Sequence, residues 1–237
     1  MLINKELLKS NAASLGIELS DGALGKFDTL AELLIEQNKT MNLTAITEPD
    51  EVVIKHFADS ISLLSAVSPE ENAKILDLGT GAGFPGIPLL ITRPDIRLTM
   101  VDSTAKKLRY VAETVEKLGL EAEVLHARAE EAGKKPEYRE QYDIVCSRAV
   151  AALNVLSEYC LPFVKVGGVF VAMKSAKAEE EIAAAKKAIG TLGGKIVDKK
   201  TFTLSDGGER TLIVIKKISQ TSAKYPRVSA QISKKPL

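Results

Sequence analysis

The feature that most constrains the fold is a glycine-rich loop that follows a short apolar segment. Residues 75–88 read ILDLGTGAGFPGIP, so Gly79, Gly81 and Gly83 stand at alternate positions. In doubly wound α/β folds, a strand that runs into such a loop and then into a helix brings the backbone close to a nucleotide-like ligand. The loop therefore predicts a doubly wound, mostly parallel sheet with a ligand site at the carboxyl end of its first strand.

The chain beyond this loop alternates between short apolar segments and helical stretches. Strands are expected at 74–78, 98–102, 122–126, 142–147 and 169–174, with a helix over 104–118. This alternation favours a parallel sheet covered on both faces. Two further strands, at 195–204 and 210–217, flank the turn sequence Asp206-Gly207-Gly208. They predict an antiparallel hairpin at the edge of a seven-stranded sheet.

The first 67 residues carry a helical pattern instead. Leu24, Phe27, Leu30 and Leu34 follow one another at three- and four-residue steps, which is typical of an amphipathic helix. The expected organisation is therefore an N-terminal helical subdomain at 1–67, a sheet domain at 68–218 and a basic C-terminal tail at 219–237.

Charge says little about partners for the whole chain, because 32 basic residues face 31 acidic ones. Residues 211–237 nevertheless carry six basic residues and no acidic one, which indicates either a polyanionic partner or a solvated segment. Cys146 and Cys160 lack the spacing of a zinc site, so no metal is expected. No apolar run suits a signal peptide or a membrane span, so we expect a cytoplasmic protein.

The residues around the glycines indicate which cofactor the loop takes. Asp102 ends the second strand, where an acid can accept hydrogen bonds from both ribose hydroxyls. Pro85 and Pro88 remove two N–H donors from the helix that follows, which disfavours a pyrophosphate. Asp77 places a carboxylate near the loop and suits a cationic group. S-adenosylmethionine therefore fits better than a nicotinamide cofactor, which stays as an alternative.

Two other strand ends supply candidate residues. Ala129 and Glu130 follow the third strand, where the adenine edge is expected, although an exposed helix start explains the same residues equally well. Arg148 ends the fourth strand, a position that faces the site rather than the core. Cys146 precedes it, and we expect no catalytic role for its thiol, because the proline that usually precedes such a nucleophile is missing.

Several motifs together resemble one family. They are 38–44 (NKTMNLT), 56–60 (HFADS), 76–88 in the glycine loop, 128–130 (RAE), 147–151 (SRAVA), 225–227 (YPR) and 235–237 (KPL). In these the chain resembles the glucose-inhibited division protein B family, the bacterial small-subunit ribosomal RNA guanine-N7 methyltransferases. The resemblance implies a class I methyltransferase fold, S-adenosylmethionine as the methyl donor and, as the acceptor, a guanine in the conserved decoding-site loop of 16S ribosomal RNA.

The resemblance also implies roles for individual residues. In the family's cofactor loop, the matching residues are Gly79 and Phe84, and in its ribose region they are Asp102, Ser103 and Thr104. Its adenine contacts correspond to Ala129 and Glu130. Arg148 corresponds to a further contact with the cofactor or the target. Family members commonly carry a glycine and a proline between the positions of Arg227 and Lys235. This chain has residues 228–233 there instead, which puts the conformation of the tail in question.

Target recognition is the least constrained part of the sequence. Beside Arg148, the candidate contacts to the guanine are His56, Asp59 and Asn42. His56 and Asp59 lie one helical turn apart and could instead form a hydrogen bond between subdomains. Asn42 could instead cap a turn. The RNA-binding candidates are Lys174, Arg210, Lys224, Arg227, Lys234 and Lys235. We expect a monomer that acts on 16S ribosomal RNA, either naked or in the small subunit.

The expected chemistry requires no general base. Guanine N7 already presents an unprotonated lone pair, so the task of the enzyme is mainly orientation. No acid/base constellation is visible in the sequence, in agreement with this mechanism. Two alternatives remain: a non-catalytic RNA-binding protein that senses S-adenosylmethionine, and a methyltransferase with another acceptor.

Overall fold

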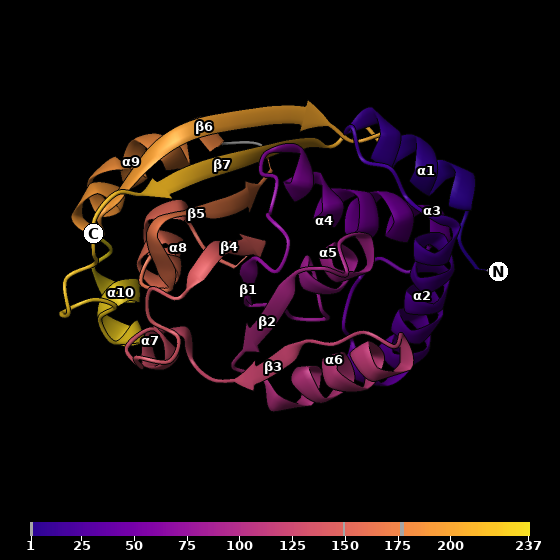
Figure 1. Ribbon diagram of the computed structural model, residues 1–237, viewed down its shortest axis with the longest axis horizontal. Helices are drawn as coiled ribbons and strands as arrows, with labels where there is room; N and C mark the ends of the chain where they lie inside the picture. Colours follow the sequence, from indigo (N-terminus) through magenta and orange to yellow (C-terminus); the bar gives the residue numbers. More distant parts are fainter. Residues whose placement is uncertain (1, 149, 176–177) are drawn as a thin grey trace.

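A seven-stranded mixed sheet forms the centre of the protein. The computed structural model describes residues 2–148, 150–175 and 178–237. The strand order is β3-β2-β1-β4-β5-β7-β6, and β7 runs antiparallel to both of its neighbours (Figure 1). The strands are β1 Lys74–Leu78, β2 Arg97–Asp102, β3 Glu123–His126, β4 Tyr142–Arg148, β5 Val164–Lys174, β6 Gly194–Thr203 and β7 Glu209–Lys217. The predicted parallel sheet with an antiparallel edge hairpin is confirmed.

Helices cover both faces of this sheet. One face carries α1 Lys5–Ser14, α2 Asp21–Met41, α3 Pro49–Glu51, the π-helix η1 Val52–Ala58, α4 Asp59–Ile61, the 3-10 helix η2 Ser62–Ser65, α5 Gly86–Thr92 and α6 Ala105–Lys117. The other carries α7 Ala129–Ala132, α8 Leu153–Cys160, α9 Ala178–Thr191 and α10 Ser229–Lys234 (Figure 1). The described part of the chain contains no helix long and apolar enough to cross a membrane.

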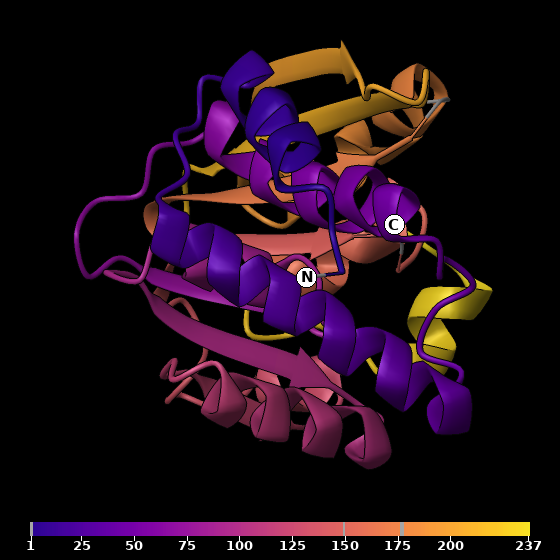
Figure 2. The ribbon, with the colours of Figure 1, turned by 90° about the vertical axis from the view of Figure 1, so that its right-hand side faces the viewer.

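The N-terminal helices share a hydrophobic core with the sheet. Leu8, Phe27 and Leu34 belong to the same buried cluster as Ile75 of β1 and Met100 of β2. Helix α2 lies across this face of the molecule, alongside α5 and α6 (Figure 2). Burial of these side chains against the sheet supplies the main stabilisation for helices that would be marginal alone. The helices predicted for 1–67 are therefore packed directly onto the sheet domain.

The segment between α2 and β1 places His56 and Asp59 next to Arg148, at the carboxyl end of β4. Ser20 caps the start of helix α2, and its Oγ accepts a hydrogen bond from Ala23 N at 3.2 Å. Asn42 caps the end of the helix in the left-handed conformation (φ 49°). A continuous helical run then extends from Pro49 to Ser65 and includes the π-helix η1. Such π-turns are frequent at functional sites, and η1 carries His56.

Strand β5 is longer than the sequence predicted. It begins at Val164 rather than at residue 169, although Gly167 and Gly168 lie within it and Gly167 has φ 89°. Its pairing with β4 shifts register between Tyr142 and Ile144. A bulge of this kind accommodates glycines inside a strand, so β5 starts before the predicted residue 169.

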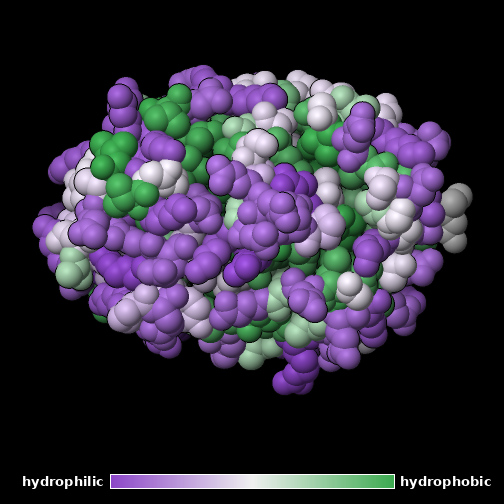
Figure 3. All heavy atoms as spheres, in the orientation of Figure 1, coloured by the Kyte–Doolittle hydropathy of each residue, from purple (hydrophilic) through white to green (hydrophobic). Residues whose placement is uncertain are grey.

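The outer surface adds little information on partners. Figure 3 shows one face that is largely hydrophilic across its centre, with apolar side chains gathered near the α9 end of β6 and β7. Single exposed apolar residues are normal on globular proteins. The informative features of this molecule therefore lie in its cavities.

Candidate active site

The glycine loop closes tightly at the carboxyl end of β1. Gly79, Gly81 and Gly83 have φ angles of 74°, 57° and 92°, which side chains with a Cβ rarely adopt. The amides of Gly83 and Phe84 both donate to Thr80 O at 2.9 Å, and α5 starts directly afterwards. The alternate glycines are therefore required by backbone conformation, and they expose main chain at the end of the strand.

Asp102 lies beside this loop at the end of β2. Its Oδ2 accepts from Gly81 N at 3.0 Å and its Oδ1 accepts from Thr104 N at 2.8 Å. Each carboxylate oxygen keeps a further lone pair, so both can still accept from a ribose hydroxyl. Thr104 thus acts through its backbone N–H, by orienting the carboxylate.

A cavity of about 290 Å³ opens above Asp102. Its lining comes from the ends of β1 and β2, from the start of α7, and from α8 and α10; it includes Gly79, Asp102, Ser103, Ala129, Glu130, Val150, Tyr159 and Ser229. Of the predicted cofactor residues, this space therefore brings together Gly79, Asp102, Ser103, Ala129 and Glu130, while Gly81, Gly83, Phe84 and Thr104 do not line it.

Asp77 lies beneath the glycine loop and does not line this cavity. The side chain is fully buried, and its Oδ2 accepts from Thr80 Oγ1 at 2.6 Å and from Gly86 N at 2.9 Å. Burial raises the pKa of Asp77 to about 6. A Cβ on Gly86 would lie only 2.9 Å from Asp77 Oδ2, which explains the glycine there. Asp77 therefore holds the loop onto α5 from inside through Oδ2, while its buried Oδ1 has no hydrogen-bond partner among the described residues.

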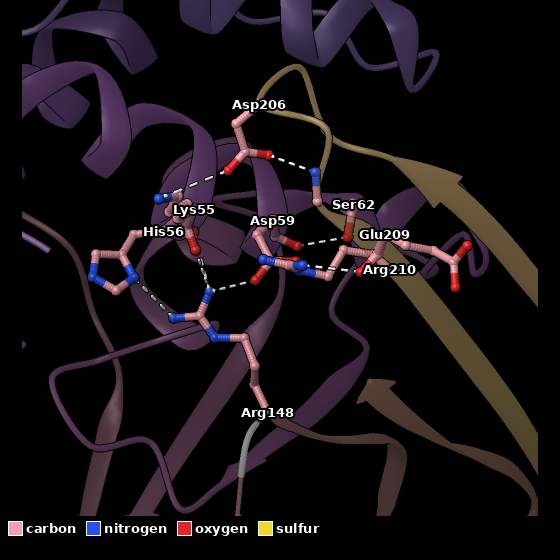
Figure 4. A network of polar contacts seen from close by, with 9 residues as sticks. Lys55, His56, Asp59, Ser62, Arg148, Asp206, Glu209 and Arg210 are labelled. Atoms are coloured by element: carbon pink, nitrogen blue, oxygen red, sulfur yellow. Dashed lines mark hydrogen bonds and ion pairs between the residues drawn. The ribbon is translucent and has the colours of Figure 1, made fainter. Parts of the chain in front are cut away.

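A second cavity, of about 380 Å³, lies at the carboxyl ends of β4 and β5. It is lined by Lys55, His56, Asp59, Arg148, Met173, Lys174, Ser175, Glu181 and Arg210. Figure 4 shows Arg148 and Arg210 converging on Asp59 from different strands. Asp59 Oδ2 accepts from Arg148 Nη1, and Oδ1 accepts from Arg210 Nε, both at 3.0 Å. The polar groups at this cavity are therefore preorganised by a buried ion-pair network.

His56 ties this network to the glycine loop. Its ring stacks on Phe84 with centroids 4.6 Å apart, and the Arg148 guanidinium lies 5.2 Å from the same Phe84 ring. His56 Nδ1 lies 3.4 Å from Arg148 Nη2, and Nε2 lies 2.8 Å from Thr44 Oγ1. Because arginine only donates, Nδ1 is the acceptor and Nε2 carries the proton. Burial and the nearby Arg148 charge lower the pKa of His56 to about 3, so the ring is neutral near pH 7.

The motif at 38–44 has a structural role in the same network. The Asn38 side chain donates to Thr44 O and accepts from Thr44 N, both at 2.9 Å. This clamp fixes Thr44, which holds His56. Asn42 ends α2 and is exposed, so the turn-cap interpretation describes its place in the structure.

The basic candidates divide into two groups. Three form ion pairs with the protein itself: Lys174 with Glu181 at 2.7 Å, Arg210 with Asp59 at 3.0 Å and Arg227 with Glu158 at 2.6 Å. Three others are exposed: Lys224, Lys234 and Lys235. Only the second group has its charge fully available to a polyanion.

Some lining residues were absent from the sequence prediction. Lys55 and Glu181 join the second cavity, while Tyr159 and Ser229 join the first. These four residues lie outside the glycine loop, and no local sequence pattern identifies them as site residues. The predicted motif at 147–151 includes Ala149, which lies outside the described residues. Burial raises the pKa of the Cys146 thiol well above its ordinary value, which agrees with the expectation that it is not a nucleophile.

Comparison with known proteins identifies the family. The family model described as GidB, rRNA small subunit methyltransferase G, matches residues 23–213. The chain belongs to this family. It is 47% identical over 236 residues to a ribosomal RNA small subunit methyltransferase G of Alkaliphilus metalliredigens, covering 99% of both chains. A relative of that name from Pelotomaculum thermopropionicum is 48% identical over 242 residues, with full coverage of both.

Solved structures show the same fold in more distant proteins. TrmN from Thermus thermophilus superimposes with a TM-score of 0.53 at 18% identity and covers 67% of this chain and 48% of its own. A branched-chain polyamine synthase mutein from the same organism gives a TM-score of 0.59 at 14% identity and covers 81% of this chain and 64% of its own. The class I methyltransferase fold is thus confirmed.

S-adenosylmethionine is the cofactor of a GidB methyltransferase, and the first cavity fits it. The backbone at Gly81 has no heavy atom closer than 4.0 Å to the position of an added Cβ, which leaves room for a ligand. The Asp102 carboxylate matches a ribose diol, and Pro85 and Pro88 stand at the start of α5 where a pyrophosphate would need N–H groups. These residues favour the phosphate-free cofactor over a dinucleotide.

Proposed function

We propose that this protein transfers a methyl group from S-adenosylmethionine to N7 of a guanine in the decoding-site loop of bacterial 16S ribosomal RNA. The observation that carries the proposal is the pairing of two cavities at one end of the sheet. One holds Asp102 and the glycine loop, and the other is ringed by Arg148, Arg210 and Lys55. The names of the relatives indicate the RNA, and the family resemblance indicates the base.

The chemistry of the second cavity supports an acceptor that needs no deprotonation. When bound, S-adenosylmethionine supplies a methyl group activated by its sulfonium. His56 is a weak base because its pKa lies near 3, and both oxygens of Asp59 already accept from arginines. Guanine N7 presents its lone pair without losing a proton. The residues of this chain therefore act by orienting the base and by excluding water.

The N–H donors around the second cavity suit an RNA substrate. Arg148, Arg210, Lys55 and Lys174 surround it. Each is paired with a carboxylate of the protein, from Asp59, Glu51 or Glu181, but arginine and lysine carry more donors than these pairs use. Phosphate groups and the guanine O6 are acceptors that match such donors. The proposal takes a monomer as the active form, and its ribosomal substrate supports a place in the cytoplasm.

The test is direct labelling of the product. Small ribosomal subunits and naked 16S RNA, both from cells lacking the activity, are incubated with labelled S-adenosylmethionine, and the label is mapped by N7-specific chain cleavage. We expect a single labelled guanine, and the more reactive of the two substrates identifies the assembly state recognised. Cofactor binding without label in either RNA would favour the non-catalytic, cofactor-sensing alternative or another acceptor.

A further inference from the structure

One wall of the cofactor cavity comes from the far end of the chain. Ser229, the first residue of α10, and Tyr159 of α8 line the same space as Gly79, Asp102 and Ala129. Their hydroxyl oxygens lie 3.0 Å apart and form a hydrogen bond. The basic tail is thus in contact with the cofactor site rather than separate from it.

Arg227 fastens this wall to α8. Its backbone N and its Nε donate to Glu158 Oε1 at 2.9 and 2.8 Å, and its Nη2 donates to Oε2 at 2.6 Å. Glu158 is fully buried, so this fork of charge-assisted bonds is shielded from solvent. Arg227 Nη1 also donates to Lys235 O at 3.1 Å. The Arg227 side chain therefore links α8 to Lys235, the residue that follows α10.

The segment before α10 is fixed as firmly. The Arg139 guanidinium donates to the carbonyl oxygens of Thr221, Ser222 and Tyr225 at 2.6, 3.2 and 2.8 Å, and to Gly133 O at 2.9 Å. Gly133 directly follows α7, whose first residues line the cavity opposite Ser229. Arg139 therefore sets the tail in position relative to the adenine side of the site.

We propose that the hydroxyl pair of Ser229 and Tyr159 binds the adenosine part of the cofactor, which makes the segment 225–234 an integral wall of the cofactor site. This inference rests on the proposed function only in taking S-adenosylmethionine as the ligand. One hydroxyl hydrogen joins the two oxygens, so the second is left to donate to a ring nitrogen or a ribose oxygen. Asp102, Ala129 and Glu130, the proposed ribose and adenine contacts, line the same cavity. The two hydroxyls therefore lie beside the adenosine part of S-adenosylmethionine rather than its methionine part.

The experiment compares three ligands on one set of variants. Dissociation constants for S-adenosylmethionine, S-adenosylhomocysteine and adenosine are measured by calorimetry on the full chain carrying Ser229→Ala, Tyr159→Phe or both. Ser233→Ala is the matched control, because Ser233 is exposed on the same helix. Thermal melting of each variant checks that the fold is intact.

We expect Ser229→Ala to raise the dissociation constants of all three ligands by a similar factor of about three to ten, the effect of one hydrogen bond. Ser233→Ala should leave them unchanged, and the double variant should lose less than the product of the single losses, because the two hydroxyls act together. Unchanged affinities in Ser229→Ala, or a loss confined to S-adenosylmethionine, would overturn the inference. Failure of the unmodified protein to bind any of the three would refute the proposed function, and this inference with it.

Discussion

The two cavities at the end of the sheet are built in different ways. One side of the first is a contiguous loop held by hydrogen bonds from backbone N–H groups, such as those that Asp102 accepts from Gly81 and Thr104. The second rests on charged side chains that are distant in sequence, since Asp59 pairs with Arg148 and Arg210 across 89 and 151 residues. Local geometry therefore sets the glycine-loop side of the proposed donor site, whereas the proposed acceptor side depends on the tertiary fold throughout.

This difference has an energetic consequence. A backbone cradle keeps its shape when a single side chain is lost. A buried ion-pair network does not, because removal of one partner leaves the others charged and desolvated. Burial already lowers the pKa of Arg148, and Asp59 is the first of the charges that oppose this effect. Single substitutions should therefore lower stability and activity more in the second cavity than in the first.

The largest effect is expected for Asp59→Ala. This change leaves Arg148 and Arg210 without their shared carboxylate, and the free energy of unfolding should fall by about 3–5 kcal/mol. Methyl transfer at saturating cofactor should fall by about two orders of magnitude, because the guanidinium groups lose their orientation. Urea unfolding and single-turnover assays measure the two effects.

Two controls keep this result interpretable. Asp50→Ala removes an exposed carboxylate from the same helical segment and should change neither quantity. Asp59→Asn keeps the shape of the side chain and should retain part of the stability. Affinity for S-adenosylmethionine should change less than twofold in all three variants. A cofactor affinity that falls as far as the rate would show that the two cavities are not independent.

Asp102→Ala should give the converse pattern. Loss of the hydrogen bonds to the ribose should weaken S-adenosylmethionine binding by roughly 1–3 kcal/mol, measured by calorimetry. RNA binding in the absence of cofactor should not change. Asp198→Ala, at an exposed position on β6, serves as the control. An unaltered cofactor affinity would remove Asp102 from the site.

The same contrast explains how much the sequence could predict. The sheet, its edge hairpin and the glycine loop follow from local patterns, and the structure confirms them. Asp102 was found because its distance from the loop is fixed by one strand and one helix. Local patterns failed where a tertiary contact decides the conformation, as at Gly167, which lies in a bulge between two stretches of β5 that both pair with β4.

Local sequence patterns do not predict which charged side chains pair with each other. Arg148, Arg210 and Asp59 were each singled out, but only the fold brings them together. Arg227 was expected to contact RNA because it lies in a basic tail. Its partner, Glu158, comes from α8, and no spacing in the sequence connects the two. Charge composition therefore identified the segment but not which of its charges are already paired.

The pH dependence of stability provides a finer test of the acceptor side. The pKa of His56 falls from 6.5 to about 3 on folding, so the unfolded chain takes up the proton first as the pH drops. The contribution of His56 is fully present above pH 6.5 and declines toward pH 3, with about 1 kcal/mol lost by pH 6. Asp77 opposes this below pH 6, because its raised pKa, about 6, favours the folded state on protonation between pH 6 and 3.8.

Variants separate the two contributions. Between pH 7.5 and 6, the melting temperature of His56→Gln should fall less than that of the unmodified protein, because the titrating group is gone. His126→Gln, at an exposed position, is the control and should follow the unmodified protein. On acidification, the melting temperature of Asp77→Asn should fall more than that of the unmodified protein, because the opposing contribution of Asp77 is lost. Identical slopes for His56→Gln and the unmodified protein would exclude His56 as the origin of the pH dependence.

The smallest effect is expected for Lys234→Ala, and it sharpens the comparison within α10 itself. Lys234 is exposed, whereas Ser229, at the start of the same helix, lines the cofactor cavity. Loss of one phosphate contact should weaken RNA binding by about fivefold near physiological salt and reduce the slope of log affinity against log salt by less than one. Cofactor affinity should stay unchanged, the reverse of the pattern for Ser229→Ala. Lys195→Ala, an exposed lysine of β6, controls for the general loss of charge. Equal salt slopes in the two lysine variants would mean that α10 serves the cofactor alone.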